Sequence, residues 1–146
     1  MKHFVIEPEV AGGWGERTVV DTAVHPPRIR HLHYQFDGWL GDEIIESFPC
    51  LIVSQRLAVL FPSTLTGFEL AEVEISKSEE FEDLCPGRIL PAFRWLKVNG
   101  TAGVDDFGVA EDNRFVISQN ALETLRQGMM SNCGVEEWRS PATGLC

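Results

Sequence analysis

Residues 51–57 read LIVSQRL, and a closely similar phrase, FVISQNAL, returns at residues 115–122. Each copy runs from apolar residues into a Ser-Gln pair and then into a short stretch with helical spacing. An apolar run without polar alternation is typical of a strand that is covered on both faces. The serine that follows is a favoured N-cap, because its hydroxyl can accept a backbone N–H of the first helical turn. The phrase therefore predicts the same local structure twice, with Ser54 and Ser118 as the caps.

The similarity continues past the phrase. In both halves a glycine turn follows the helical stretch and leads into a further strand, FELAEV in the first half and VEEW in the second. The internal similarity spans residues 50–75 and 114–138, and no linker between the copies is long enough to separate two domains. We therefore expect one α+β domain over residues 1–146, with a mixed or antiparallel sheet, a few short helices and two similar strand-helix-strand units. Such a unit can arise by duplication or as one packing solution reached twice.

Five other stretches complete the expected organisation. AGGWG at residues 11–15 predicts a flexible turn, and RIRHLHYQFDGW at 28–39 alternates apolar and polar residues as a strand with one buried face does. FELAEVEI at 68–75 changes parity midway, which indicates either a bulge or two short strands. AFRWLKVNG at 92–100 has large side chains on both faces and predicts a central strand. TAGVDDFGVAED at 101–112 is rich in small and acidic residues and predicts a loop.

Charge and hydropathy limit the classes of partner. Twelve Lys and Arg stand against 22 Asp and Glu, so the net charge is -10, and such a chain repels nucleic acid and anionic lipid. No apolar run approaches the ~20 residues that a membrane span needs. Glu7 and Glu9 interrupt the N-terminal segment before a signal-peptide core can form. These observations predict a cytoplasmic protein that binds neither nucleic acid nor membrane.

The densest acidic stretch is ELAEVEISKSEEFED at residues 69–83, where seven acids accompany Lys77 alone. These charges can serve solubility, can protect an edge strand from aggregation, or can attract a basic protein partner. Trp39 lies between glycines in DGWLGD beside two acids, which is typical either of a protein-binding loop or of a loop that buries its tryptophan over the sheet. The residues that we expect to contact a partner are Trp39, Asp42, Glu43, Glu69, Glu72, Glu74, Glu79, Glu80, Asp105 and Asp106.

Residues that could carry chemistry are few. His31 and His33 alternate along a strand, so both imidazoles could share a metal with acids of the Asp105-Asp106 loop. The competing interpretation is a polar, solvent-facing side of the strand. The serines have no Gly-x-Ser-x-Gly context, and the four cysteines lack the spacing of a zinc knuckle. We therefore expect a protein without catalytic activity or cofactor, with a small metal-binding protein or metal-dependent enzyme as the alternative.

The second half resembles a known family. Its Pro-x-Phe-x-Trp-Leu strand, Asp-Asp-Phe-Gly loop, Val-Ile-Ser phrase and closing Gly-Val-Glu resemble the C-terminal part of immunity proteins of bacterial polymorphic toxin systems, and FPCLIVSQRLAVLFPSTLTGFELAEVEI echoes the pattern in the first half. The resemblance covers residues 44–138. A relative in layout, the double-CxxCG immunity family, carries two CxxC pairs that this chain lacks, so no zinc site is implied. The resemblance implies a cytoplasmic antidote that binds and neutralises a cognate toxin without catalysis.

Overall fold

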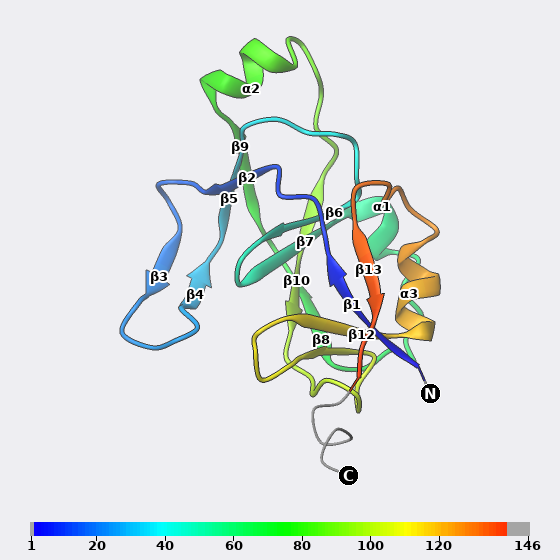
Figure 1. The fold of residues 1–146 in the computed structure, drawn as a ribbon. Helices are drawn as coiled ribbons and strands as arrows, with labels where there is room; N and C mark the ends of the chain where they lie inside the picture. Colours follow the sequence, from blue (N-terminus) through cyan, green and yellow to red (C-terminus); the bar gives the residue numbers. More distant parts are fainter. Residues whose placement is uncertain (1, 140–146) are drawn as a thin grey trace.

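The fold, in a computed structural model that describes residues 2–139, contains four sheets and three short helices in an α+β arrangement (Figure 1). The strands are β1 (His3–Glu7), β2 (Gly12–Trp14), β3 (Val19–Asp21), β4 (Arg28–His31), β5 (His33–Phe36), β6 (Ile44–Ser47), β7 (Cys50–Ser54), β8 (Phe68–Ala71), β9 (Glu74–Lys77), β10 (Phe93–Val98), β11 (Phe107–Val109), β12 (Phe115–Ser118) and β13 (Gly134–Glu137). The helices are α1 (Gln55–Ala58), α2 (Glu79–Leu84) and α3 (Gln119–Leu125). The predicted fold class is confirmed.

The two predicted serine caps are present. The Ser54 hydroxyl accepts the Leu57 N–H at 3.1 Å, and the Ser118 hydroxyl accepts the Ala121 N–H at the same distance. Both serines have extended backbone, as an N-cap requires, and both are buried. The repeated phrase therefore forms the strand, cap and helix that it predicts in each half.

The two four-stranded sheets have the same architecture. Their orders are β6-β7-β10-β8 and β11-β12-β1-β13, and all neighbouring strands are antiparallel. Ser54 pairs with Phe93 across β7 and β10, and Ser118 pairs with His3 across β12 and β1. The strand that opens each half therefore lies inside the sheet of the other half. This exchange joins the two halves of the chain into one packed unit.

The segment that follows each exchanged strand pairs with its own half of the chain. The chain after β1 forms a parallel bridge between Glu9 and Ile45 of β6, and the chain after β10 forms one between Thr101 and Val109 of β11. Each half thus runs strand, bridge, hairpin, helix and strand in the same order. Residues 10–42 and 72–91 are additions that have no counterpart in the second half as far as the structure describes it, to residue 139.

These additions form the remaining sheets. β2, β5 and β9 make a three-stranded sheet in which β5 and β9 are parallel, while β3 and β4 form a separate hairpin, seen at the left of Figure 1. α2 follows β9 and lies at the upper end of the molecule in that view.

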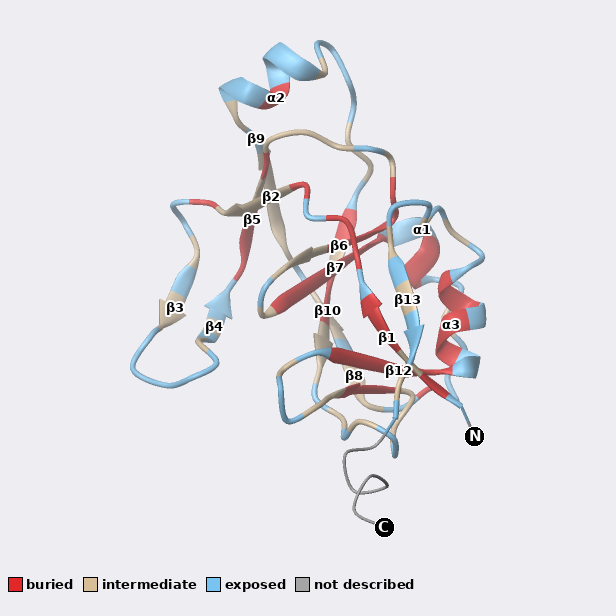
Figure 2. Ribbon diagram, in the orientation of Figure 1, coloured by how far each residue is buried: buried red, intermediate tan, exposed pale blue. Residues whose placement is uncertain are grey.

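The core has two parts, and β7 contributes to both. Leu51 and Val53 point to one side and Cys50 and Ile52 to the other, so the strand is buried on both faces as its apolar run predicts (Figure 2). The other large side chains of the first part are Ile6, Ile44, Leu57, Leu65, Leu96, Phe107, Phe115, Ile117, Leu122 and Leu125. Those of the second part are Leu32, Tyr34, Phe36, Ile45, Phe81, Phe93 and Trp95.

The stretch 92–100 is confirmed as a central strand, because β10 lies between β7 and β8. Three expectations for local structure are wrong. Residues 107–109 form a strand where a loop was expected, because they pair with β12. Residues 12–14 form a strand where a turn was expected, and residues 28–39 contain two strands interrupted at Leu32. The parity change in 68–75 marks two strands, β8 and β9, in different sheets.

Candidate functional site

Two carboxylates bind the two capping serines in the same way. The Ser54 hydroxyl donates to Oε2 of Glu43 at 2.6 Å, and the Ser54 N–H donates to the Glu43 carbonyl at 2.9 Å. The Ser118 hydroxyl donates to Oδ1 of Asp106 at 2.5 Å, and its N–H donates to the Asp106 carbonyl at 2.8 Å. We call Glu43–Ser54 and Asp106–Ser118 the acid–serine pairs.

The second oxygen of each carboxylate reaches the other half of the chain. Glu43 Oε1 accepts the Met129 N–H, which lies just after α3, and Asp106 Oδ2 accepts the Thr66 N–H, which lies after α1. Both distances are 2.9 Å. Each acid therefore links the serine of its own half to the loop that follows the helix of the other half. This geometry assigns both acids an architectural role.

Arg56 completes the environment of Glu43. Its Nη2 lies 2.5 Å from Glu43 Oε1, and its Nε lies 3.0 Å from Oε2. Burial favours a raised pKa for the Glu43 carboxyl, but the hydrogen bonds from Arg56 and Ser54 outweigh it and leave the pKa below its ordinary value. Glu43 is thus held as a charged acceptor inside the fold.

Asp42 and Glu43, which the sequence places among the partner contacts, are instead part of the interior. Both side chains are buried, Asp42 being 1% exposed. The Asp42 carboxylate accepts the Asn132 backbone N–H at 2.8 Å and the Asn132 side-chain amide at 3.1 Å. A partner could reach neither carboxylate without opening the fold.

The Asp105-Asp106 loop also has a structural explanation. Both side chains are half-buried, and the Asp105 carboxylate accepts the Thr101 N–H at 2.8 Å, closing a turn. Asp105 Oδ2 and Asp106 Oδ2 thus each accept a backbone N–H, and Asp106 Oδ1 accepts the Ser118 hydroxyl, so both acids are engaged in holding the loop.

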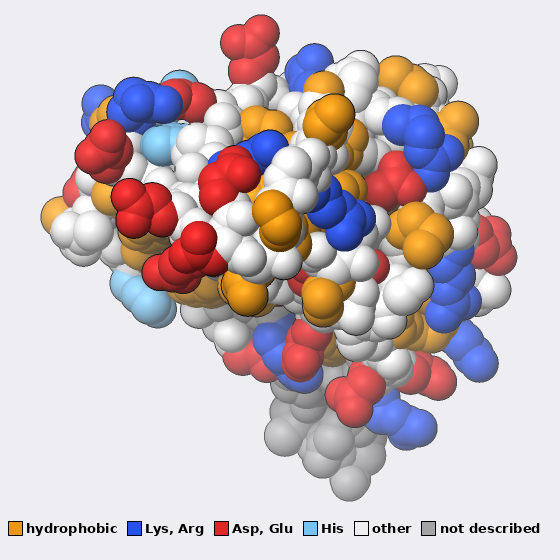
Figure 3. Space-filling model, turned by 90° about the horizontal axis from the view of Figure 1, so that it is seen from above, with side chains coloured by type: hydrophobic (Ala, Val, Ile, Leu, Met, Phe, Trp, Pro, Cys, Tyr) orange, Lys and Arg blue, Asp and Glu red, His pale blue; other side chains and the backbone are white. Residues whose placement is uncertain are grey.

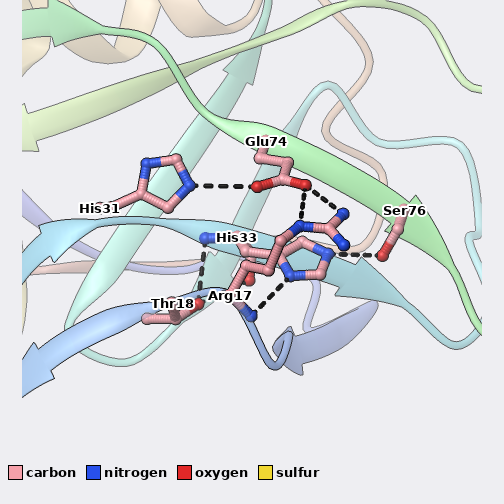
Figure 4. Close-up of polar contacts among 6 residues, drawn as sticks. All are labelled: Arg17, Thr18, His31, His33, Glu74 and Ser76. Carbon is pink, nitrogen blue, oxygen red and sulfur yellow. Dashed lines mark hydrogen bonds and ion pairs between the residues drawn. The ribbon is translucent and has the colours of Figure 1, made fainter.

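The histidines belong to a separate polar cluster, in which His31 ends β4, His33 begins β5, and their partners lie on β9 (Figure 4). His31 is exposed and its Nε2 lies 3.1 Å from Oε1 of Glu74, which also pairs with the Arg17 guanidinium. His33 is buried, with Nε2 2.7 Å from the Ser76 hydroxyl. The expectation that both imidazoles face solvent is wrong for His33, because the segment from Gly15 to Arg17 covers its ring.

The metal geometry proposed from the sequence is not formed in the part of the chain that the structure describes. Across residues 2–139 no three His, Cys, Asp or Glu side chains come together in a way that could hold a metal ion. The two histidines instead take different partners, Glu74 for His31 and Ser76 for His33.

The Ser76–His33 contact is not arranged for nucleophilic catalysis. His33 Nδ1 accepts the Arg17 backbone N–H at 3.2 Å, so in the neutral ring the proton resides on Nε2. That proton is donated to Ser76. A histidine base needs an unprotonated nitrogen facing the hydroxyl, and this tautomer presents the opposite arrangement.

The pKa of the Glu74 carboxyl lies far below its ordinary value. Hydrogen bonds from Arg17 and then His31 lower its pKa to about 2. Its charge is paired with the Arg17 guanidinium, so it contributes less to the acidic surface than its position in the segment 69–83 suggests.

The remaining predicted residues lie on the surface. Glu69 is on β8 and Glu72 follows it, while Glu79 and Glu80 occupy the first turn of α2, and all four are exposed. β8 and β9 are the end strands of their sheets. The acidic segment thus runs along two sheet edges onto α2, and Trp39 lies half-buried near the other end of that helix, as its contact with Arg88 shows.

Sequence reasoning missed Arg17 and Ser76, and it also missed the pairing of Glu43 and Asp106 with the serines. The last has a weak signal in the sequence: an acid precedes each Ser-Gln pair, 11 residues before Ser54 and 12 before Ser118. Comparison of the chain with protein-family models, curated proteins and solved structures found no match. Within residues 2–139, no helix has the length and apolar character needed to cross a membrane.

Proposed function

We propose that this chain is a cytoplasmic immunity protein that binds a cognate bacterial toxin and neutralises it by non-catalytic protein–protein contact. The observation that carries the proposal is the set of exposed carboxylates within residues 69–83, which lie on the edge strand β8, directly after it, and on α2. The resemblance of residues 44–138 to immunity proteins gives the class of partner.

The interior polar groups support a binding role. Glu43, Asp106, Ser54 and Ser118 satisfy one another and the backbone across the two halves. His33 and Ser76 are paired in a tautomer that opposes base catalysis. Groups that are fully engaged in holding the fold are poorly suited to exchange protons or electron pairs with a substrate.

The charge supports a basic partner. A net charge of -10 with an exposed acidic segment produces a negative potential, and complementary charge accelerates encounter with a basic surface and selects against acidic ones. A toxin domain with a basic face fits this requirement.

The test is co-expression with the toxin domains encoded beside the gene. The chain should restore growth of cells that express one of them and should bind the purified domain in calorimetry. Replacing Glu72, Glu79 and Glu80 with Gln should weaken binding. The matched control replaces Glu111, Glu136 and Glu137, which are exposed acids elsewhere, and removes the same charge. Failure to neutralise any adjacent toxin would refute the proposed function.

A further inference from the structure

The end of the molecule that carries α2 exposes large aliphatic side chains. Leu40 is 71% exposed, Leu84 73% and Ile89 85%. Figure 3 looks onto this end, where hydrophobic side chains lie among acidic and basic ones. Isolated exposed aliphatics are ordinary on a protein surface, but a connected group of them marks an interaction site.

The segments that carry these side chains lie side by side. The Arg88 guanidinium lies 4.6 Å from the centre of the Trp39 ring. A methyl group placed on Gly38 would lie 3.8 Å from Leu84, which shows that the loop before Trp39 runs beside α2. A shallow pocket joins Trp39 and Leu40 to Val10. We call this group the Trp39 surface; its members are Val10, Trp39, Leu40, Leu84, Arg88 and Ile89.

Hydrogen bonds and a ring contact to the interior hold the Trp39 surface in place. The Trp39 indole N–H donates to the Asp42 carbonyl at 2.8 Å, and its ring contacts Phe93 edge to face at 6.3 Å. The Glu9 carboxylate accepts the Leu40 N–H at 2.7 Å. Lys77 Nζ donates to the Arg88 carbonyl at 2.6 Å. The loop is thus fixed by hydrogen bonds while Leu40 points to solvent, and a preformed apolar surface loses little conformational freedom on binding.

The charges beside this surface select the partner. Phe81 is fully buried and anchors α2, so Glu79, Glu80, Glu82 and Asp83 are left exposed. Arg88 and Lys77 are the nearby cations, and both are already in contact with aromatic rings of this chain. An apolar patch with a stacked Trp and Arg at its centre and acids along one side suits a ligand that carries aliphatic side chains flanked by Lys or Arg.

We propose that the Trp39 surface binds a basic, amphipathic segment of the partner protein, and that it supplies the apolar contacts of the interface. This inference rests on the proposed function for the identity of the partner. The acids of α2 guide the segment, and Leu40, Leu84 and Ile89 contact its aliphatic side chains.

The partner-independent test uses a synthetic amphipathic peptide of Lys and Leu, with a control peptide in which every Lys is Glu. In amide NMR spectra of the full chain, the basic peptide should shift Gly38, Leu40, Leu84 and Ile89, and the acidic peptide should not. Shifts confined to other surfaces, or none, would overturn the proposal.

The second arm uses the toxin domain that the chain neutralises. Leu84→Ser with Ile89→Ser should weaken binding about tenfold or more. Val59→Ser with Val104→Ser, at other sites with similar exposure, should not, and thermal melting checks the fold of each variant. Unchanged affinity in the first variant would overturn the proposal while leaving the immunity function intact. If no toxin is bound, the immunity function fails and the peptide arm alone decides. A dimer in sedimentation velocity that the first variant dissociates would also overturn it, since the occupant would be a second copy of this chain.

Discussion

Ser118 and Asp106 are joined twice, by a hydroxyl-to-carboxylate hydrogen bond of 2.5 Å and by a backbone hydrogen bond of 2.8 Å. The same serine caps α3 and the same carboxylate reaches Thr66 in the other half. Ser118 thus ends β12 and caps α3, and its hydroxyl orients the Asp106 carboxylate that links the two halves. Ser54 and Glu43 repeat the arrangement.

Ser118→Ala should lower the free energy of unfolding by about 2–3 kcal/mol, because it removes an N-cap and leaves a charged acceptor without one of its donors. Ser54→Ala should have a similar effect, and neither change should alter partner recognition. Urea denaturation measures the loss. Ser63→Ala, in an exposed loop, is the control; equal stability of the two variants would contradict the role of the acid–serine pairs.

Glu74→Gln should change how stability depends on pH. Its pKa is about 2 in the folded chain against an ordinary value of 4.5. A lowered folded pKa adds stability that is fully present above the unfolded pKa and is lost as pH falls through the folded one. The wild type should therefore lose this contribution between about pH 4.5 and 2, and the variant should show a shallower decline. Glu80→Gln, on the surface of α2, should reproduce the wild-type curve; a similar flattening there would show that the effect is not specific to the Arg17 and His31 contacts.

Phe107→Ala should lower the free energy of unfolding by about 3–5 kcal/mol, as truncation of a buried aromatic does. Phe107 is fully buried and stacks on Phe61 with ring centroids 5.8 Å apart. Val104→Ala, in the exposed turn just before it, should cost less than about 0.5 kcal/mol. Comparable losses for both changes, measured by thermal melting, would mean that β11 is not part of the core.

Cys50 should resist modification in the folded protein. It is buried, and burial raises the pKa of its thiol to about 12, so little reactive thiolate forms at neutral pH. Iodoacetamide labelling followed by peptide mass spectrometry should find Cys50 modified only after unfolding. Rapid labelling in native buffer would contradict its position in β7.

Local signals in the sequence predicted the helix caps but not every strand. The Ser-Gln phrases predicted the caps because a cap depends on residues within one helical turn. β2 was missed because glycines read as a turn. At Gly12 the absence of a side chain serves close strand approach instead, since a Cβ there would lie 1.9 Å from the Gln35 carbonyl oxygen. Glu43 and Asp106 were expected on the surface because acids usually are, and their burial depends on donors from the far half of the chain.

The sequence did not predict the exchange of β1 and β10, because strand partners depend on tertiary packing. The exchange predicts how fragments of the chain should behave. Cleavage between the exposed Gly87 and Arg88 would give fragments 1–87 and 88–146. Alone, the first lacks β10 from the middle of its sheet and the second lacks β1, so each leaves unpaired strand edges and exposed core. Neither fragment should show cooperative melting by itself. Co-expressed, the two should purify together and regain the circular dichroism spectrum of the whole chain. A cooperative transition in either isolated fragment would mean that its sheet is stable without the exchanged strand.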